Sequence, residues 1–446
     1  MTDGNPSIVG VAVRDLGRLR AVAFTVARHG FGPLLMKTPL GKRLFDKPPQ
    51  GDEALREASA PVRFAKLLAA LGPTYIKLGQ ILSMRKDIFA PDWIEALETL
   101  QDDAPGLPYS VIREQVEASL GGTLDQLYAT FEQEPLATAS IAQTHRALTK
   151  DGDEVVVKVQ RPGIEKTMRS DLDLLYLAAQ VLEASIDEMQ IAGVVSIVEE
   201  FEKGLLGELD FNRELSNLLE FQRHLDPARK VTVPRPHPEL STRTVLTMQF
   251  FSGRPIRKLT PKSPEAQAVV NEIVHSALKQ VFVDGVFHGD PHAGNLLYGE
   301  DGTVCMIDLG MIGRLSQEQR DDIVTLAIAT IANDATTIAR VLLKMGTPMQ
   351  RVNLSELKAD IVRIRQQHLM VDSFGEYDSA GFIAEFAKAA GRYRIKLAKD
   401  LAILGKAAAT LEDIIRTLHP DVDLIGIARP FLDDIVERRL SPQRIL

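Results

Sequence analysis

The spacing of hydrophobic residues changes several times along this chain and predicts the order of its elements. From residue 54 to 100 apolar residues recur at helical spacing, with an interruption at Gly72-Pro73. The segment "DEVVVKVQRP" (153–162) instead holds a β-branched run between two turn sequences, and "RTVLTMQFFSG" (243–253) also ends in a turn. We expect one strand in each of these two segments.

Helical periodicity returns between these strands, from about residue 171 to 225. Beyond residue 264 the pattern predicts helix nearly throughout, and "TVCMIDLG" (303–310) is the exception. A Pro/Gly-rich link, "APGLPYS" (104–110), follows the first helical region. The pattern therefore predicts an α+β fold with two lobes and a binding cleft between them.

Three segments follow from this order of elements. We expect an N-terminal helical extension at 1–105, a small sheet-containing N-lobe at 106–250 and a large helical C-lobe at 251–446. A chain of 446 residues, 45% of them hydrophobic, is long enough to bury a core in each lobe.

Charge is distributed unevenly along the chain. The first fifty residues hold eight Lys or Arg against three Asp, a local +5, so the overall charge of −8 leaves −13 for the rest. Residues 8–36 mix this charge with apolar side chains, including Phe24, Phe31 and Leu35, and predict one or two basic amphipathic helices. Such a helix packs on its own domain or lies on an anionic membrane surface, and both alternatives stay open.

Composition excludes several classes of protein. The acidic balance argues against broad nucleic-acid binding, and the single cysteine, Cys305, excludes an intrachain disulfide and a zinc cluster. No apolar run approaches the roughly 20 residues that span a bilayer. We therefore expect a cytoplasmic protein, with any contact to the inner membrane peripheral.

Lys158 lies in the middle of the predicted strand "VVVKV" with apolar neighbours on both sides. A lysine in a half-buried strand requires a carboxylate or phosphate partner, unless it extends to solvent from an edge strand. The predicted helix "GELDFNRELSN" (207–217) offers Glu208, Asp210 and Glu214 as partners. Each of these acids taken alone also fits a solvated helix face.

The loop "HGDPHAGN" (288–295) and the segment "MIDLGMIGRL" (306–315) carry the clearest chemistry. Asp290 precedes Asn295 by five residues, and Asp308 follows at the end of an apolar strand. Carboxylate and amide oxygens suit a hard divalent cation such as Mg²⁺. The same order, strand lysine, helix glutamate, Asp, Asn and Asp, occurs in protein kinases.

Two phosphate-binding motifs are absent from the sequence. No G-x-G-x-x-G precedes Lys158, and no G-x-x-x-x-G-K-[ST] occurs anywhere. The alanine-rich segment "PLATASIAQTHRA" (135–147) occupies the place of the glycine-rich loop. Its small side chains allow the backbone to approach phosphates, but they tolerate positive φ less well than glycine does.

These residues resemble the AarF/UbiB family of atypical kinases, which is associated with coenzyme Q biosynthesis. The motifs that carry the resemblance are "KLGQ" (77–80), "PLATASIAQTH" (135–145), Lys158, "ELDFNREL" (208–215), "HGDPHAGN", "IDLGMIGRL" and "LGKAAATLE" (404–412). The resemblance covers nearly the whole chain and implies a bilobed protein kinase-like fold.

The resemblance also implies roles for the charged residues. Lys77 and Gln80 would belong to an extension that folds over the cleft and restricts access of protein substrates. Lys158 would pair with Glu214 and with the α- and β-phosphates. Glu208 and Asp210 would contact the extension.

The remaining implied roles concern ATP or ADP and Mg²⁺. Asp290 would be the catalytic carboxylate, while Asn295 and Asp308 would hold Mg²⁺. Met248 and Phe250 would flank the adenine hinge, where Gln249 replaces the usual glutamate. The nucleotide loop would comprise Leu136, Ala137, Thr138, Ala139, Ser140, Ile141, Ala142, Gln143 and Thr144.

The sequence thus predicts an atypical kinase or ATPase that uses Mg-ATP, and the resemblance implies a role in isoprenoid-quinone metabolism. Quinone precursors or other lipids are the expected partners. An ordinary protein Ser/Thr kinase is disfavoured because no A-P-E sequence follows Asp308. The remaining alternative is a nucleotide-gated module that binds hydrophobic precursors with little phosphotransfer.

Overall fold

The computed structural model describes residues 16–36, 42, 58–83, 89–100, 104–185, 194–368, 385, 389–422, 427 and 431. The chain forms two compact units. The first comprises Met1–Asn212 and His237–Thr247, and the second Arg213–Pro236 and Met248–Leu446. The boundary between them passes through helix α13 (Phe211–His224) and strand β6 (Val245–Gln249).

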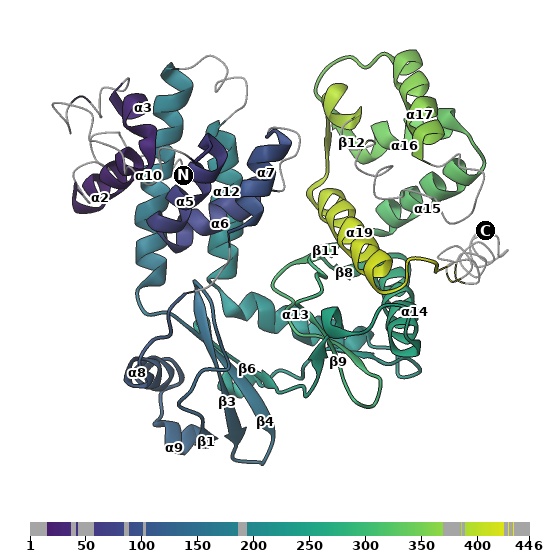
Figure 1. The fold of residues 1–446 in the computed structure, drawn as a ribbon. Coiled ribbons are helices and arrows are strands. Elements are labelled where there is room, and N and C mark those ends of the chain that lie inside the picture. Colours follow the sequence, from purple (N-terminus) through teal and green to yellow (C-terminus); the bar gives the residue numbers. More distant parts are fainter. Residues whose placement is uncertain are drawn as a thin grey trace, which may run out of the picture. The chain divides into compact units, whose positions relative to one another are not determined.

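A five-stranded sheet lies in the first unit (Figure 1). Its order is β1-β3-β4-β6, and β2 pairs with β3. The strands other than β6 are β1 (Tyr128–Phe131), β2 (Ala137–Thr138), β3 (Ala142–Thr149) and β4 (Glu154–Gln160). The two strands expected at 153–162 and 243–253 are confirmed as β4 and β6.

The sheet packs against two helices, α8 (Tyr109–Leu120) and α9 (Leu124–Leu127). Val155, Val157 and Val159 of β4 are fully buried in this cluster, as is Ile112 of α8. A β-branched run fits such a position because its side chains pack well on a pleated surface. This packed strand carries Lys158.

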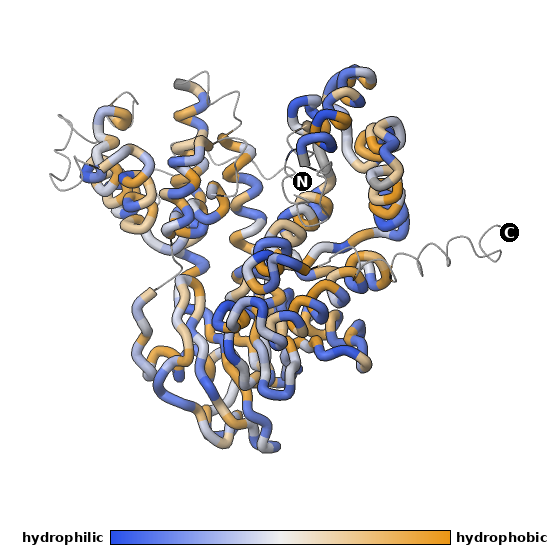
Figure 2. Tube along the Cα trace, turned by 45° about the vertical axis from the view of Figure 1, so that its right-hand side comes forward, coloured by the Kyte–Doolittle hydropathy of each residue, from blue (hydrophilic) through white to orange (hydrophobic). Residues whose placement is uncertain are grey.

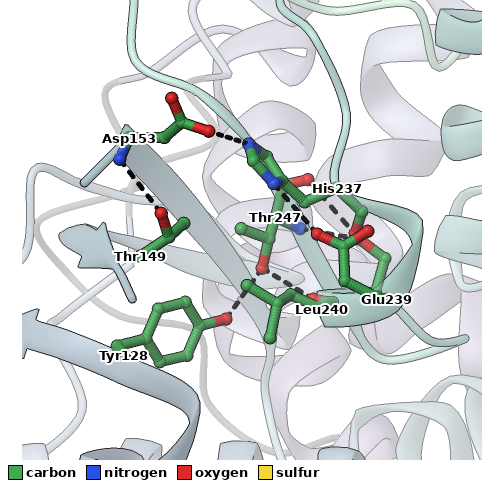
Figure 3. A network of polar contacts seen from close by, with 8 residues as sticks. Tyr128, Thr149, Asp153, His237, Glu239, Leu240 and Thr247 are labelled. Atoms are coloured by element: carbon green, nitrogen blue, oxygen red, sulfur yellow. Dashed lines mark hydrogen bonds and ion pairs between the residues drawn. The ribbon is translucent and has the colours of Figure 1, made fainter. Parts of the chain in front are cut away.

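The segment His237–Thr247 joins the first unit through a polar network around the Thr247 hydroxyl (Figure 3). Thr247 Oγ1 donates to the Leu240 carbonyl at 2.7 Å and lies 2.8 Å from the Tyr128 hydroxyl. His237 Nδ1 lies 3.0 Å from Glu239, and its Nε2 lies 3.9 Å from an Asp153 carboxylate oxygen. These contacts secure the end of the sheet.

Seven helices of the described first unit form a separate helical layer, drawn at the top of that unit in Figure 1. They are α2 (Leu16–Val26), α3 (Gly32–Met36), α5 (Ala60–Leu71), α6 (Pro73–Leu82), α7 (Pro91–Glu98), α10 (Ile164–Ser185) and α12 (Val194–Glu208). One hydrophobic cluster joins α5, α6 and α7 to α10 and α12. The core of the N-terminal extension is therefore completed by helices from the middle of the chain.

Helix α2 packs on its own unit by burying Leu19 and Ala23, and Ala27, which follows the helix, is buried as well. Arg18 adds a bidentate contact to the buried Asp171 of α10, with Nε 2.7 Å from Oδ1. Phe24 is 51% exposed on the same helix. Of the other seven basic residues in the first fifty, four lie outside the described residues: Arg14, Lys37, Arg43 and Lys47.

The second unit contains the remainder of α13 and several very short strands. The strands are β5 (Val231–Thr232), β7 (Arg254–Pro255), β8 (Val286–His288), β9 (Leu296–Tyr298), β10 (Val304–Met306), β11 (Ile312–Arg314), β12 (Gly346–Pro348) and β13 (Ile395–Leu397). The strand expected at 303–310 is confirmed as β10. The expectation of helix nearly everywhere else beyond residue 264 is wrong, since strands of two or three residues are too short to show alternation.

Within its described residues, the second unit also contains five further α-helices and a π-helical turn, η5 (Gln280–Asp284), which lies just before β8. The helices are α14 (Pro264–Lys279), α15 (Gln317–Ile331), α16 (Ala335–Met345), α17 (Leu354–His368) and α19 (Lys399–Leu418). A buried cluster joins Leu401 and Ala407 of α19 to Phe287 of β8 and to Leu315. Helix α19 thus lies against the strand that leads to Asp290.

None of the helices that the structure describes combines the length and the apolarity needed to cross a bilayer. Hydrophilic positions interrupt the hydrophobic ones along these helices (Figure 2).

Candidate functional site

The Asp290 loop is fixed by the antiparallel pair β8–β11, in which His288 faces Ile312. The Gly289 N–H donates to the Met311 carbonyl at 2.9 Å. A Cβ on Gly289 would lie 2.8 Å from Ile403 Cγ2, so this position requires glycine for close packing against α19. The carboxylate of Asp290 follows directly and is partly exposed.

His288 supports the Asp290 loop through two hydrogen bonds. Its backbone N–H donates to Gln280 Oε1 at 3.0 Å, and its Nδ1 accepts the Asp290 N–H at 3.2 Å. Burial lowers the pKa of His288 to about 4. The ring is therefore neutral at pH 7, which agrees with Nδ1 acting as an acceptor.

Asn295 and Asp308 lie at the same end of the pair β9–β10, because Asn295 precedes β9 and Asp308 follows β10 in antiparallel register. The Ile307 N–H donates to the Asn295 carbonyl at 3.0 Å. Asn295 Nδ2 donates to the Asp290 carbonyl at 3.4 Å, and this contact ties the pair to the Asp290 loop. The structure thus brings Asp290, Asn295 and Asp308 into one region.

This donor set fits Mg²⁺. An amide oxygen and a carboxylate on neighbouring strand ends are hard ligands, and kinase-type sites complete the shell with phosphate oxygens. No cluster of three or more His, Cys, Asp or Glu suited to a metal occurs within the described part of the chain.

Helix α13 is tied to the Asp308 segment by two contacts within the second unit. Asn217 Nδ2 donates to the Leu309 carbonyl at 2.7 Å, and Arg314 pairs with Glu220 at 2.6 Å. Glu214 lies one turn earlier on the same helix and is 5% exposed. The position of Glu214 is thus coupled to that of Asp308.

Asp290 also has an ion-pair partner that sequence reasoning missed. Lys406 Nζ of α19 lies 3.0 Å from Asp290 Oδ1, and both side chains are about a third exposed. The motif "LGKAAATLE" contains this lysine, but nothing in its local pattern indicates a partner in the Asp290 loop.

Lys158 is partly buried in β4, opposite Thr144 of β3. Its ammonium lies 5.3 Å from the centroid of the Phe211 ring, within cation–π range. Glu214 belongs to the other unit, so the pairing of Lys158 with Glu214 stays a prediction.

The alanine-rich segment forms the β2–β3 hairpin, whose turn is closed by the Ala139 N–H donating to the Ala142 carbonyl at 2.8 Å. Arg161 Nε donates to the Ala139 carbonyl at 2.8 Å and braces the turn. Of its residues, Leu136 is 52% exposed, while Ser140 and Gln143 are buried. The amide of Gln143 contacts the backbone of Leu107.

The extension contacts the end of α12, where Lys77 Nζ lies 3.2 Å from Glu208 Oε2. Gln80 Nε2 donates to the Leu100 carbonyl at 3.3 Å. Gly79 has no room for a Cβ beside Leu100, so α6 packs closely on its neighbours. Asp210 Oδ1 accepts the Asn212 N–H at 3.1 Å and caps α13.

The segment around Gln249, which the resemblance implies is the adenine hinge, is held by backbone pairing. Gln249 N–H donates to the Arg235 carbonyl at 2.7 Å, and Met248 forms a bridge with Pro236. Met248 is buried and Phe250 partly buried. The roles of both residues toward a nucleotide, like those of the alanine-rich segment, stay predictions.

Comparison with known proteins identifies relatives over most of this length. The family model of the ABC1 atypical kinase-like domain matches residues 99–342. A protein of Marinobacter nauticus named "Probable protein kinase UbiB" is 32% identical over 395 residues, which cover 86% of this chain and 71% of that protein. A protein of the same name from Azotobacter vinelandii is 31% identical over 453 residues, with 98% and 83% covered.

Among solved structures, the Rv3197–erythromycin complex from Mycobacterium tuberculosis aligns with a TM-score of 0.53 and 22% identity. The alignment covers 81% of this chain and 93% of that one. At this identity the likeness concerns the fold alone. With the family match, it confirms the expected kinase-like α+β fold.

Proposed function

This chain belongs to the ABC1 atypical kinase-like family, which includes the bacterial UbiB proteins, and we propose that it binds Mg-ATP and hydrolyses or transfers the γ-phosphate. One observation carries the proposal. Asp290 and Asn295 of one loop and Asp308 of a second segment are joined by backbone and side-chain hydrogen bonds in one region. That arrangement suits phosphoryl transfer, which depends on positioning and electrostatic stabilisation.

Each residue then has a defined task. Asn295 and Asp308 would hold Mg²⁺, which neutralises phosphate charge when it is bound. Asp290 would accept the proton of the attacking hydroxyl or water. Lys158 would bind the α- and β-phosphates, since the residues on both sides of it in β4 are fully buried and fix its position.

The UbiB name of the relatives supports a role in ubiquinone-type biosynthesis, with isoprenoid-quinone precursors or other lipids as ligands. The site would work in the cytoplasm, at or near the inner face of the membrane. Neither the acceptor nor the membrane contact is needed for the basal reaction proposed here, which is Mg-dependent ATP hydrolysis.

The test is ATPase turnover of the full chain with and without Mg²⁺, anionic vesicles and a quinone-precursor analogue. Asp290→Asn should lower turnover to a small residual rate, and Asp308→Asn should abolish it. Asp308→Asn should also weaken Mg-dependent nucleotide binding by roughly 1–3 kcal/mol. Asp301→Asn is the matched control, because Asp301 is an exposed carboxylate in the turn between β9 and β10.

Wild-type turnover in Asp308→Asn would show that the activity arises elsewhere and would overturn the proposal. Nucleotide binding without turnover under all these conditions would favour a nucleotide-gated lipid-binding module.

A further inference from the structure

The loop that carries Asp290 contains no lysine or arginine of its own. Between Asp290 and Asn295 the sequence reads Pro-His-Ala-Gly. His288, which precedes Asp290 in the loop, is neutral because burial lowers its pKa to about 4. The permanent cation next to the Asp290 carboxylate is instead supplied by α19, where Lys406 Nζ lies 3.0 Å from Oδ1.

Helix α19 is held in place against this loop by more than one contact. Ile403 fills the space that a side chain on Gly289 would take, one residue before Asp290. Leu401 and Ala407 are buried beside Phe287 of β8. Asp400 Oδ1 accepts the Arg314 N–H at 3.1 Å, at the far end of the β8–β11 pair.

Helical spacing then directs Lys406 at the loop. Ile403, Lys406 and Ala407 are three and four residues apart and share one face of α19. Because Ile403 packs against Gly289 and Ala407 is buried, this face of α19 is fixed against the loop, and the Lys406 side chain stays close to Asp290. An ion pair between mobile surface side chains contributes little to stability, but this pair forms between two elements that pack on each other.

We propose that Lys406 is a positioning residue of the phosphoryl-transfer site: it fixes the orientation of the Asp290 carboxylate toward the attacking group. This inference rests on the proposed function. It adds a residue that lies outside the span of the matched family domain, 99–342. The helix is thus part of the reaction site rather than only a support for the fold.

The role predicts a specific kinetic pattern. A carboxylate that must accept a proton works only within hydrogen-bond reach of the attacking group, so loss of its partner should lower kcat. The binding of Mg-ATP involves Asn295, Asp308 and Lys158 and should change little. Outer partners of reacting groups typically contribute 10- to 100-fold, and we expect a loss on that order.

The experiment compares Lys406→Met, Lys406→Gln and Lys406→Arg in the full chain. The Met and Gln variants should lose roughly 10- to 100-fold in kcat with KM for Mg-ATP within about threefold of wild type, and Arg should restore part of the rate. Lys399→Met is the matched control, because Lys399 is an exposed lysine at the first position of the same helix. It should keep wild-type kcat.

A double-variant cycle separates positioning from a purely structural effect. In the Asp290→Asn background, Lys406→Met should cause little further loss of residual turnover, because both changes act on one carboxylate. Fully additive losses would overturn the proposal. An unchanged kcat in Lys406→Met, or a loss confined to nucleotide affinity, would also overturn it. An increased kcat would overturn it as well and would indicate that the ion pair is inhibitory.

The outcomes also distinguish this inference from the proposed function. Wild-type turnover in Lys406→Met beside an inactive Asp308→Asn would overturn the role of Lys406 alone. Wild-type turnover in Asp308→Asn, or no Mg-ATP turnover in the unmodified protein, would overturn both. If Lys406→Met does not fold, as judged by its thermal unfolding, the Gln and Arg variants carry the same comparison.

Discussion

The side-chain amide of Asn217 donates a hydrogen bond of 2.7 Å to the carbonyl oxygen of Leu309, and both residues are buried. This bond joins α13, which carries Glu214, to the residue that follows Asp308. A buried carbonyl without its donor costs about 1–3 kcal/mol. The contact therefore links the position of the helix glutamate to that of the expected metal ligand.

Asn217→Leu removes this donor and keeps a side chain of similar size. We expect the free energy of unfolding to fall by about 1–3 kcal/mol. Turnover should fall as well, because α13 and the Asp308 segment are no longer joined by this hydrogen bond. Chemical denaturation and ATPase kinetics measure the two effects. Arg223→Ala, an exposed change on the same helix, is the control. A stability loss without any change in turnover would show that the bond is only structural.

The Lys77–Glu208 pair predicts that the extension restrains the site. Lys77→Ala should raise autophosphorylation, and Glu208→Gln should do the same, because either change removes the 3.2 Å contact. The pair is partly exposed, so stability should change by less than about 1 kcal/mol. Phosphate incorporation with labelled ATP measures the effect. Lys66→Ala, on an exposed position of α5, is the control. Unchanged phosphorylation in both variants would show that the extension does not restrain the site and has only a structural role.

Arg18 and Asp171 predict a stability effect at the N-terminus. Asp171 is fully buried, and besides Arg18 it accepts a hydrogen bond from Thr74 Oγ1 at 2.7 Å. Arg18→Ala should cost about 2–3 kcal/mol, since it leaves a buried carboxylate without its cation. Arg20→Ala, exposed on the same helix, should cost almost nothing. Equal unfolding midpoints for the two variants would contradict this account of α2.

Phe24 tests the membrane alternative without removing α2. The side chain is 51% exposed, whereas Phe31 packs on Phe64 with ring centroids 6.1 Å apart. Phe24→Asp should weaken binding to anionic vesicles in co-sedimentation, because it puts a negative charge where an apolar side chain would enter the interface. Binding should also weaken with salt. Vesicle binding equal to wild type, or insensitive to salt, would leave α2 as a packing helix.

His288 predicts a pH dependence of stability. Its pKa of about 4 lies below the unfolded value near 6.5, so the unfolded state binds more protons between these pH values. This contribution is fully present above about pH 6.5 and is lost as pH falls toward 4, by up to about 3 kcal/mol. Urea titrations from pH 7 to 4 should show a shallower decline for His288→Gln than for wild type. Parallel curves would refute the burial argument.

The sequence by itself determined the secondary-structure elements and the functional groups whose signals lie within one short stretch of the chain. Strand β4 followed from the β-branched run around Lys158, because β-branched residues bounded by turn residues favour a strand of that length. Asp290, Asn295 and Asp308 could be recognised from their spacing and their oxygen chemistry. Both are properties of segments short enough to read directly from the chain.

Tertiary structure alone decided which distant segments meet. The core of the extension required α10 and α12, and Asp290 gained Lys406 from a helix near the end of the described chain. The short strands β8 and β11 pair with each other, and β9 pairs with β10 and β7. They exist because of this pairing, not because three residues favour a strand. Such contacts depend on the packing of whole elements, and a periodic apolar face shows that an element packs without showing which distant element it packs against.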